Sequence, residues 1–208
     1  DYGLYSFKDF FKNSKIKKIN LSSNLITSNG RFQIKEYFYK LDNLKILNLG
    51  ISKSSFAKNN LGNESSDTLR DLILNCKSLE VLILDSNNLS QDGIFVLADG
   101  LQNSFLKELT IKNNNLNSNC FEYLLKKGIN LTKLDLSYNK IKDGSEMFLA
   151  NFSFSNNQLQ TLNLAYNNIT SVFFNSLTNN FYKNSKISKL IIKGNKLQDV
   201  NPDFISQL

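Results

Sequence analysis

No histidine occurs in the 208 residues of the chain, and this absence removes a large part of enzyme chemistry. Catalytic triads that use histidine as their base are excluded, as are metal sites built on imidazole ligands. The chain also lacks a glycine-rich phosphate loop and a Gly-Lys-Ser/Thr element, which are signatures of nucleotide binding. We therefore expect no cofactor, no bound metal and no catalytic activity.

Cysteine and long apolar runs are scarce as well. The two cysteines, Cys76 and Cys120, provide neither a disulfide framework nor the spacing of a metal site. We interpret both as small buried apolar residues and expect a reduced, intracellular and cytoplasmic environment. No apolar run approaches the roughly 18 residues of a membrane-spanning helix, so the sequence predicts no membrane span.

Arginine is rare in a chain that is otherwise basic. Lysine and arginine total 25 against 18 acidic residues, which gives a net charge of +7, yet only Arg31 and Arg70 are arginines. Lysine favours solubility and weak non-specific attraction, whereas bidentate recognition of bases and phosphates depends on arginine. The composition therefore argues against nucleic acid as the partner.

What the sequence contains is a repeat, seen most clearly in residues 131–141, LTKLDLSYNKI. Leu134 and Leu136 are two residues apart, so both point to one side of a strand. Asn139 falls in the following turn, where its carboxamide can satisfy backbone groups of its own turn and of a neighbouring repeat. The recurrence indicates a repeat protein rather than one globular core. Copies begin near Ile16, Leu44, Leu79, Leu106, Leu131, Leu159 and Ile187, at steps of 25 to 35 residues.

The second copy departs from the pattern. Ser52 and Ser54 stand where the asparagine and the closing apolar residue are expected, while Asn59 and Leu61 supply this pair seven residues later. We interpret the difference as a seven-residue insertion within residues 50–58, with Phe56 as a candidate contact residue in the inserted loop. The alternative is a degenerate repeat without an insertion.

Each interval between strands has room for a helix. The clearest is residues 90–101, in which Ile94, Leu97, Ala98 and Leu101 recur at helical spacing and Ser90 can cap the start. Similar apolar faces are predicted at Phe32, Ile34 and Phe38; Leu69, Leu72 and Ile73; Phe121, Leu124 and Leu125; Met147, Phe148 and Leu149; and Phe174, Leu177 and Phe181.

The strand motif and helix together resemble the ribonuclease-inhibitor-like class of leucine-rich repeat. Residues 89–116 carry that class's helix pattern, G-x-x-x-L-A-x-x-L, at Gly93, Leu97, Ala98 and Leu101. The resemblance implies an α/β leucine-rich-repeat solenoid of about seven repeats. Such proteins are enzyme inhibitors, innate sensors, GTPase regulators or assembly scaffolds, so the resemblance is specific for the fold and loose for the function. The 25-residue fourth step, the insertion and the missing end caps depart from the class.

The shape follows from the spacing of the elements. Parallel strands lie about 4.8 Å apart, whereas helix axes need about 10 Å, so a row of such repeats must curve. We expect a horseshoe with the parallel β-sheet on the concave side and the helices on the convex side. We also expect residues 1–208 to be a single domain truncated at both ends. Residues 1–15 have the pattern of a helix from a preceding repeat, and the seventh strand has almost no chain after it to form a helix.

A broad concave surface suits a protein ligand. Solvated positions have no need of the apolar residues and paired tyrosines that strand alternation places there, and tyrosine is enriched among interface hot spots. The alternative is that these are ordinary exposed residues. Asp85 and Asp135 lie two repeats apart, roughly 10 Å at strand spacing, which is wide for a catalytic carboxylate pair. The predicted partner-binding residues are Ile46, Val81, Ile83, Asp85, Lys112, Asp135, Tyr138 and Tyr166.

Two classes of function remain. The first is a non-catalytic protein–protein interaction module that binds a protein partner on its concave face, or the ligand-sensing part of a larger regulatory protein. The second is a constitutive structural or scaffold subunit of a large intracellular assembly. A docked subunit should also carry apolar residues on its helix exteriors, where Tyr37, Tyr39, Phe173 and Phe174 are candidates.

Overall fold

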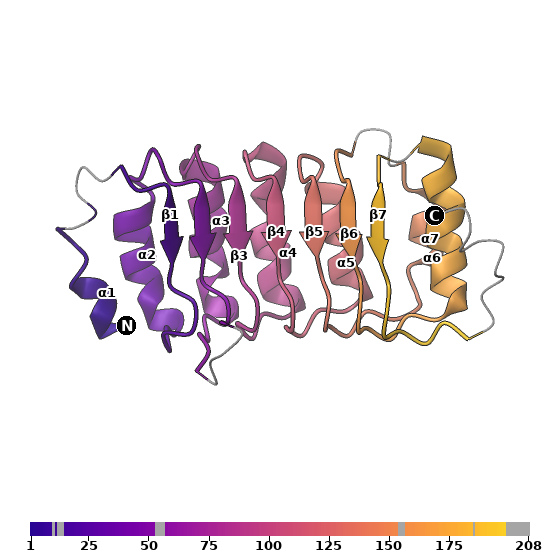
Figure 1. Cartoon of the computed structure of the whole chain (residues 1–208), viewed down its shortest axis with the longest axis horizontal. Coiled ribbons are helices and arrows are strands. Elements are labelled where there is room, and N and C mark those ends of the chain that lie inside the picture. The colour runs from indigo at the N-terminus through magenta and orange to yellow at the C-terminus, as the bar shows by residue number, and fades with distance from the viewer. Residues whose placement is uncertain (10, 12–14, 53–56, 154–156, 185, 199–208) are drawn as a thin grey trace.

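The computed structural model describes residues 1–9, 11, 15–52, 57–153, 157–184 and 186–198, which form one row of repeats (Figure 1). The strands are β1 (Lys18–Asn20), β2 (Ile46–Asn48), β3 (Val81–Ile83), β4 (Glu108–Thr110), β5 (Lys133–Asp135), β6 (Thr161–Asn163) and β7 (Lys189–Ile191). The helices are α1 (Tyr2–Tyr5), α2 (Arg31–Phe38), α3 (Ser66–Asn75), α4 (Gln91–Asp99), α5 (Ser118–Lys127), α6 (Glu146–Asn151) and α7 (Ser171–Asn184).

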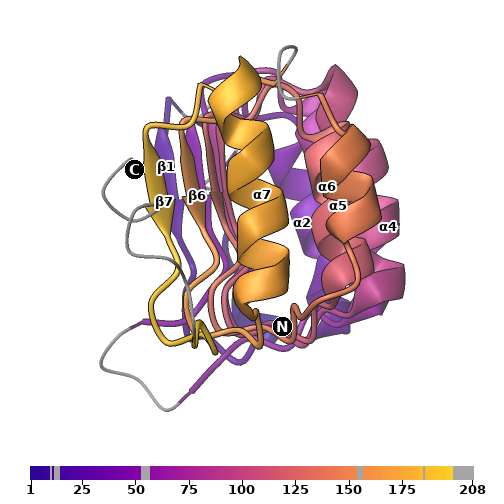
Figure 2. The same cartoon turned by 90° about the vertical axis from the view of Figure 1, so that its right-hand side faces the viewer.

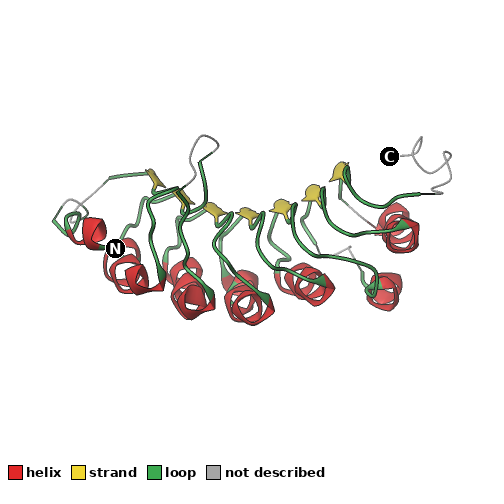
Figure 3. Cartoon of the chain, turned by 90° about the horizontal axis from the view of Figure 1, so that it is seen from below, coloured by secondary structure: helices red, strands yellow, loops and turns green. Residues whose placement is uncertain are grey.

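The strands described by the structure form a seven-stranded sheet in chain order, and every neighbouring pair is parallel. Seen along the row, the sheet and the helices form two layers (Figure 2). Seen from below, the strands lie on the inner side of a shallow arc and the helices on the outer side (Figure 3). The prediction of an α/β solenoid with a parallel sheet on its concave side is confirmed.

The core is a stack of leucines. The central residue of each inner strand, such as Leu47, Leu82 or Leu134, is almost fully buried, while the residues on either side of it lie on the open face. Replacing a buried leucine with alanine costs about 2–5 kcal/mol, because transfer energy is lost and a cavity remains. The leucine column therefore fixes which face of each strand is open.

Each strand starts two residues after the first leucine of its motif. The backbone N–H of Leu79 donates to the carbonyl of Cys76 (3.0 Å), and the N–H of Leu131 donates to Gly128 (3.0 Å). These short-range bonds close a turn at the end of the preceding helix. In the second to sixth repeats the first leucine of the motif is therefore a buried turn residue, and sheet pairing begins after it.

Asparagine side chains connect the turns that follow the strands. In Asn139, the Oδ1 atom accepts from the N–H groups of Asn114 (3.1 Å) and Leu116 (3.2 Å) in the preceding repeat, and Nδ2 donates to Leu136 of its own repeat (2.9 Å). One amide thus serves two turns, as the sequence predicts. The same role is held by Asn59, Asn87, Asn114, Asn167 and Asn195.

In the second repeat, Asn59 is the asparagine that connects the turns. Its Oδ1 atom accepts from Asn24 (3.0 Å) and Ile26 (2.9 Å), and Leu61, two residues further on, is fully buried. Ser52 instead bonds through its backbone N–H to the Ser23 hydroxyl (2.8 Å). The seven-residue insertion stays a proposal, and Phe56 lies outside the described residues.

The helix prediction is best in the third repeat, where α4 buries Gly93, Ile94, Leu97 and Ala98. It is wrong for Phe32 and Met147, which are 59% and 84% exposed. Each residue of a helix is rotated by about 100° from the one before, so residues two apart lie on nearly opposite faces. Since Ile34 and Leu149 face the core, Phe32 and Met147 must face solvent.

Two further helix expectations change. The helix predicted over residues 1–15 is limited to α1 among the described residues, where Leu4 and Phe11 nevertheless reach the core. Tyr37, Phe173 and Phe174 are buried rather than on the helix exterior. Within the part of the chain that the structure describes, the helices are too short or too polar to cross a membrane.

Candidate functional site: the sheet face and the turns that follow it

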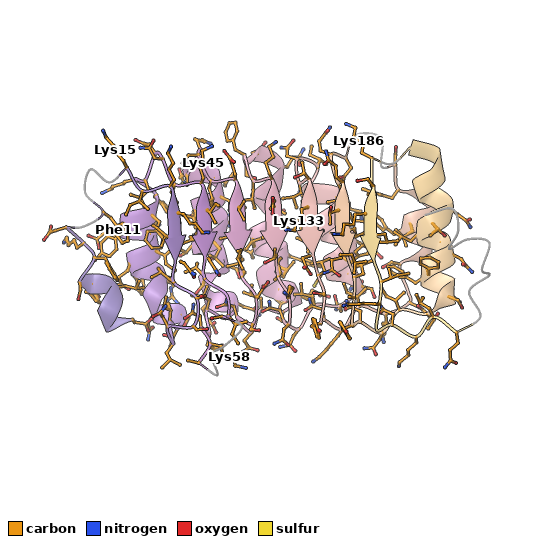
Figure 4. The ribbon with its side chains drawn as sticks, viewed as in Figure 1. Phe11, Lys15, Lys45, Lys58, Lys133 and Lys186 are labelled. Atoms are coloured by element: carbon orange, nitrogen blue, oxygen red, sulfur yellow. The ribbon has the colours of Figure 1, made fainter. Side chains whose placement is uncertain are left out.

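The open face of the sheet carries two columns of side chains. Pairing aligns Ile46 with Val81 in one column and sets Ile83 opposite Thr110 in the other. Ile46, Val81 and Ile83 are half-buried by their neighbours, so they form a low apolar area over β2 and β3. Next to this area, Lys133 pairs with Glu108 across β4 and β5 (3.1 Å), and Figure 4 shows Lys133 in the middle of the sheet face.

Asp85 follows β3 and is held by the next repeat. Its Oδ1 atom accepts from the Thr110 hydroxyl (2.8 Å) and the backbone N–H of Lys112 (2.9 Å), while the Lys112 ammonium lies 3.9 Å from Oδ2. The side chain is only 12% exposed. Burial raises the pKa of Asp85 above its ordinary value, although these hydrogen bonds oppose the shift.

Asp135 ends β5 and has a different set of partners. Its Oδ1 atom accepts from the backbone N–H (3.0 Å) and hydroxyl (2.7 Å) of Ser137, and its Oδ2 atom accepts from Asn163 Nδ2 (2.9 Å). Asp85 and Asp135 therefore stand in separate hydrogen-bond groups. Each carboxylate is engaged in joining neighbouring repeats, which the sequence pattern did not reveal.

Tyr138 and Tyr166 lie in the turns after β5 and β6. Their rings stack with a centroid separation of 4.3 Å and an interplanar angle of 17°. The two side chains remain 51% and 41% exposed. Partial burial and the adjacent Tyr166 phenol raise the pKa of Tyr138 above its ordinary value.

Residues of the seventh repeat pack against the tyrosine stack. Gly194 lies against the Tyr166 ring so closely that an added Cβ atom would fall 2.4 Å from Cδ1. The Lys193 ammonium lies 5.7 Å from the centre of the same ring. Glycine is thus required at position 194, both for its φ of +73° and for the space that the ring fills.

The backbone at both tyrosines is left-handed, with φ of 58° at Tyr138 and 54° at Tyr166. The equivalent turn residues in other repeats, Ser86 (φ 58°), Asn113 (φ 50°) and Gly194, share this conformation. Asparagine and glycine adopt it readily, whereas a bulky side chain does so at a cost in free energy. The turn geometry therefore does not explain the two tyrosines.

The predicted residues fall into two groups rather than one patch. Ile46, Val81 and Ile83 lie over β2 and β3, while the tyrosine stack follows β5 and β6, with β4 between the groups. Sequence reasoning also missed a hollow of about 670 Å³ beside the turns that follow the first four strands. Its lining includes Asn60, Asn88, Asn113 and Asn115. A column of exposed asparagines was the available sequence signal.

Comparison with known proteins agrees with this architecture. A family model described as "Leucine Rich repeat" matches residues 75–98 and 129–145. A second model, described as "Leucine Rich Repeat", matches residues 158–180. The mouse NACHT, LRR and PYD domains-containing protein 4C is 30% identical over 155 residues, covering 72% of this chain and 16% of the relative. The mouse NACHT, LRR and PYD domains-containing protein 4E is 27% identical over 197 residues, covering 92% of this chain and 19% of the relative.

The repeats, the sheet and these matches show that the chain belongs to the leucine-rich-repeat family. It spans less than a fifth of the length of these curated relatives. Leucine-rich-repeat domains are generally non-catalytic modules for protein interaction, because the curved row of repeats presents an extended surface. The ribonuclease-inhibitor-like subtype remains an expectation from the helix pattern.

Proposed function

We propose that this domain is a non-catalytic protein-interaction module that binds a protein partner through its concave face and the adjoining turns. Tyr138 and Tyr166 are its anchors. The observation that supports this best is an exposed, stacked tyrosine pair at backbone positions where a tyrosine costs stability. Tyrosine offers large rigid contact area and is enriched among interface hot spots.

The other predicted residues take supporting roles in this proposal. Ile46, Val81 and Ile83 offer apolar contact at the far side of β4. Lys112 is 40% exposed and only loosely paired, so it can set the orientation of a partner, with Asp135 as a fixed negative charge beside the tyrosines. Asp85 positions Lys112. Phe56 stays a candidate contact from the proposed insertion.

The relatives favour a regulated binder. Their names combine leucine-rich repeats with NACHT and PYD domains in one protein, and the present chain corresponds to a small part of each. We infer that residues 1–208 are one domain of a longer protein, and that the repeats supply its ligand-sensing part. No cofactor enters this function. The two buried free cysteines support an intracellular, cytoplasmic setting.

A constitutive scaffold subunit is the second candidate. Phe32 on α2, Met147 on α6 and Val172 on α7 are exposed apolar residues of the helical layer, which a permanently docked subunit would cover. These residues lie on different helices, and Phe173 and Phe174 beside them are buried. We therefore rank the concave face first.

The test compares two variants of the full-length protein by affinity capture and thermal unfolding. Tyr138→Asn with Tyr166→Asn keeps residues suited to the left-handed turn, so the melting temperature should stay the same or rise while partner recovery is lost. The control, Phe32→Ser with Met147→Ser and Val172→Ser, should retain the partner. Loss of the partner in the control alone would establish the scaffold function instead.

A further inference from the structure

The turns at the end of the strands form a continuous polar edge. The hollow beside the first four strands lies on this edge, and Asn113 in its lining occupies the turn position directly before Tyr138 in the neighbouring repeat. Figure 4 shows Lys58, another lining residue, at the same edge and Lys45 and Lys186 at the opposite one. The hollow and the tyrosine stack are therefore neighbours along one line.

The amides of the hollow are only partly used. Asn113 Nδ2 donates to Ser86 Oγ (2.8 Å) and Asn115 Nδ2 donates to Asn88 Oδ1 (3.1 Å). Within the described part of the chain, no side-chain bond engages Asn60 or the acceptor oxygens of Asn113 and Asn115. An amide offers a donor and an acceptor, the combination that pairs with the peptide groups of an extended chain.

Unpaired lysines flank the tyrosine stack. Lys140, Lys193 and Lys196 are exposed, and no carboxylate among the described residues lies within 4.0 Å of their ammonium groups. Nearby Asp143 is engaged by the backbone N–H (3.0 Å) and hydroxyl (2.6 Å) of Thr170. These hydrogen bonds leave the charge of Asp143 in place, so the three lysines exceed the two carboxylates of Asp135 and Asp143 by one. The end of the edge that carries the tyrosines therefore has a small positive excess, which suits acidic groups.

The geometry of the stacked rings favours one of two acidic partners. Single-stranded nucleic acid binds by stacking its bases on free aromatic faces. Each tyrosine covers one face of the other, and Gly194 also lies against the Tyr166 ring, so the pair offers a base fewer free faces than two separate rings would. The exposed parts of the two side chains, 51% of Tyr138 and 41% of Tyr166, suit apolar and carboxylate side chains.

We propose that an extended acidic segment of a protein binds along this edge, with its backbone against the amides of the hollow and its carboxylates on Lys140, Lys193 and Lys196. This inference rests on the proposed function and specifies the chemistry of the partner. From the second to the seventh turn the edge is about 24 Å long at strand spacing. An extended segment of about seven or eight residues covers that length.

The probe is a displayed library of random peptides of about twelve residues, long enough to span the edge. Selection on the protein should enrich sequences rich in aspartate and glutamate. A labelled selected peptide should lose at least about tenfold in affinity when Lys140, Lys193 and Lys196 are changed to glutamate. Added salt should weaken it as well. The charge-matched control changes Lys17, Lys107 and Lys186, at the opposite edge, to glutamate and should retain the peptide.

The outcomes separate this inference from the proposed function. Enriched peptides that are neutral or basic, yet lose affinity in the Tyr138→Asn, Tyr166→Asn variant, would overturn the acidic segment and leave the proposed function standing. Peptides that bind both lysine variants and the tyrosine variant equally would overturn both. A labelled oligothymidylate that binds more tightly than every selected peptide, and loses affinity in the tyrosine variant, would overturn the inference in favour of nucleic acid.

Discussion

Replacement of Asn59 by alanine should destabilise the domain far more than an ordinary turn substitution. The Asn59 amide accepts from the N–H groups of Asn24 and Ile26 and donates to the carbonyls of Leu21 (2.9 Å) and Leu49 (2.8 Å). The residue is 1% exposed. Alanine leaves all four backbone groups without this partner.

The expected magnitude follows from which of these groups can reach water. The bonds to Ile26 and Leu49 are buried, whereas those to Asn24 and Leu21 are partly buried and can be replaced by solvent. The Leu49 carbonyl also accepts from Asn87 Nδ2 (2.9 Å) and keeps that bond, so the Ile26 N–H is the buried group left unsatisfied. One unsatisfied buried group costs about 1–3 kcal/mol, which is the loss we predict. Such a loss is a large fraction of the total stability of a domain.

The measurement is urea unfolding followed by circular dichroism, since the chain has no tryptophan. Asn60→Ala is the matched control, because Asn60 is the next residue, is exposed and makes no side-chain bond among the described residues. It should change the free energy of unfolding by less than about 0.5 kcal/mol. Equal losses of unfolding free energy in the two variants would refute a stabilising role for the asparagines that connect the turns.

Three further predictions concern the loop, the carboxylates and the thiols. Deleting residues 51–57 should change the free energy of unfolding by less than about 1 kcal/mol if they are an insertion, and unfolding of the variant would exclude that interpretation. Asp85→Asn should be neutral or stabilising, since an amide oxygen can still accept from Thr110 and Lys112. Asp135→Asn should cost about 1–2 kcal/mol of stability, because its NH₂ group would face Asn163 Nδ2. Equal losses of stability in the two variants would contradict this. Burial raises the pKa of Cys120 from 9.0 to about 11, so stability should fall as the pH rises between these values, and Cys120→Ala should lessen the fall.

The architecture was predictable because the same pattern of leucines and asparagine recurs in successive repeats. Strand alternation around Leu134 and the recurrence of Asn139 specify which face is buried and how the turns are joined, and the structure shows both. Apolar spacing alone was a weaker guide to the helices. Met147 has the hydrophobicity of a core residue, but Leu149 two positions later takes the core side of a six-residue helix.

The positions of the candidate site residues could be predicted from the sequence, but the side chains that they contact could not. Register places Tyr138 beside Tyr166, but their stacking depends on the space left by Gly194 in the next repeat. Likewise, Asp85 could be placed after β3, but its bond to Thr110 joins side chains 25 residues apart. Such pairings depend on side-chain geometry across repeats, for which a single sequence contains no pattern.

Photo-crosslinking from single positions tests the central claim most directly. A benzoylphenylalanine placed at position 166 reports on the tyrosine edge, and one at position 147 reports on the helical layer, where Met147 is 84% exposed. We predict that the partner crosslinks from position 166 and not from position 147, with both variants folded. A partner that crosslinks from position 147 alone would contradict binding at the concave face.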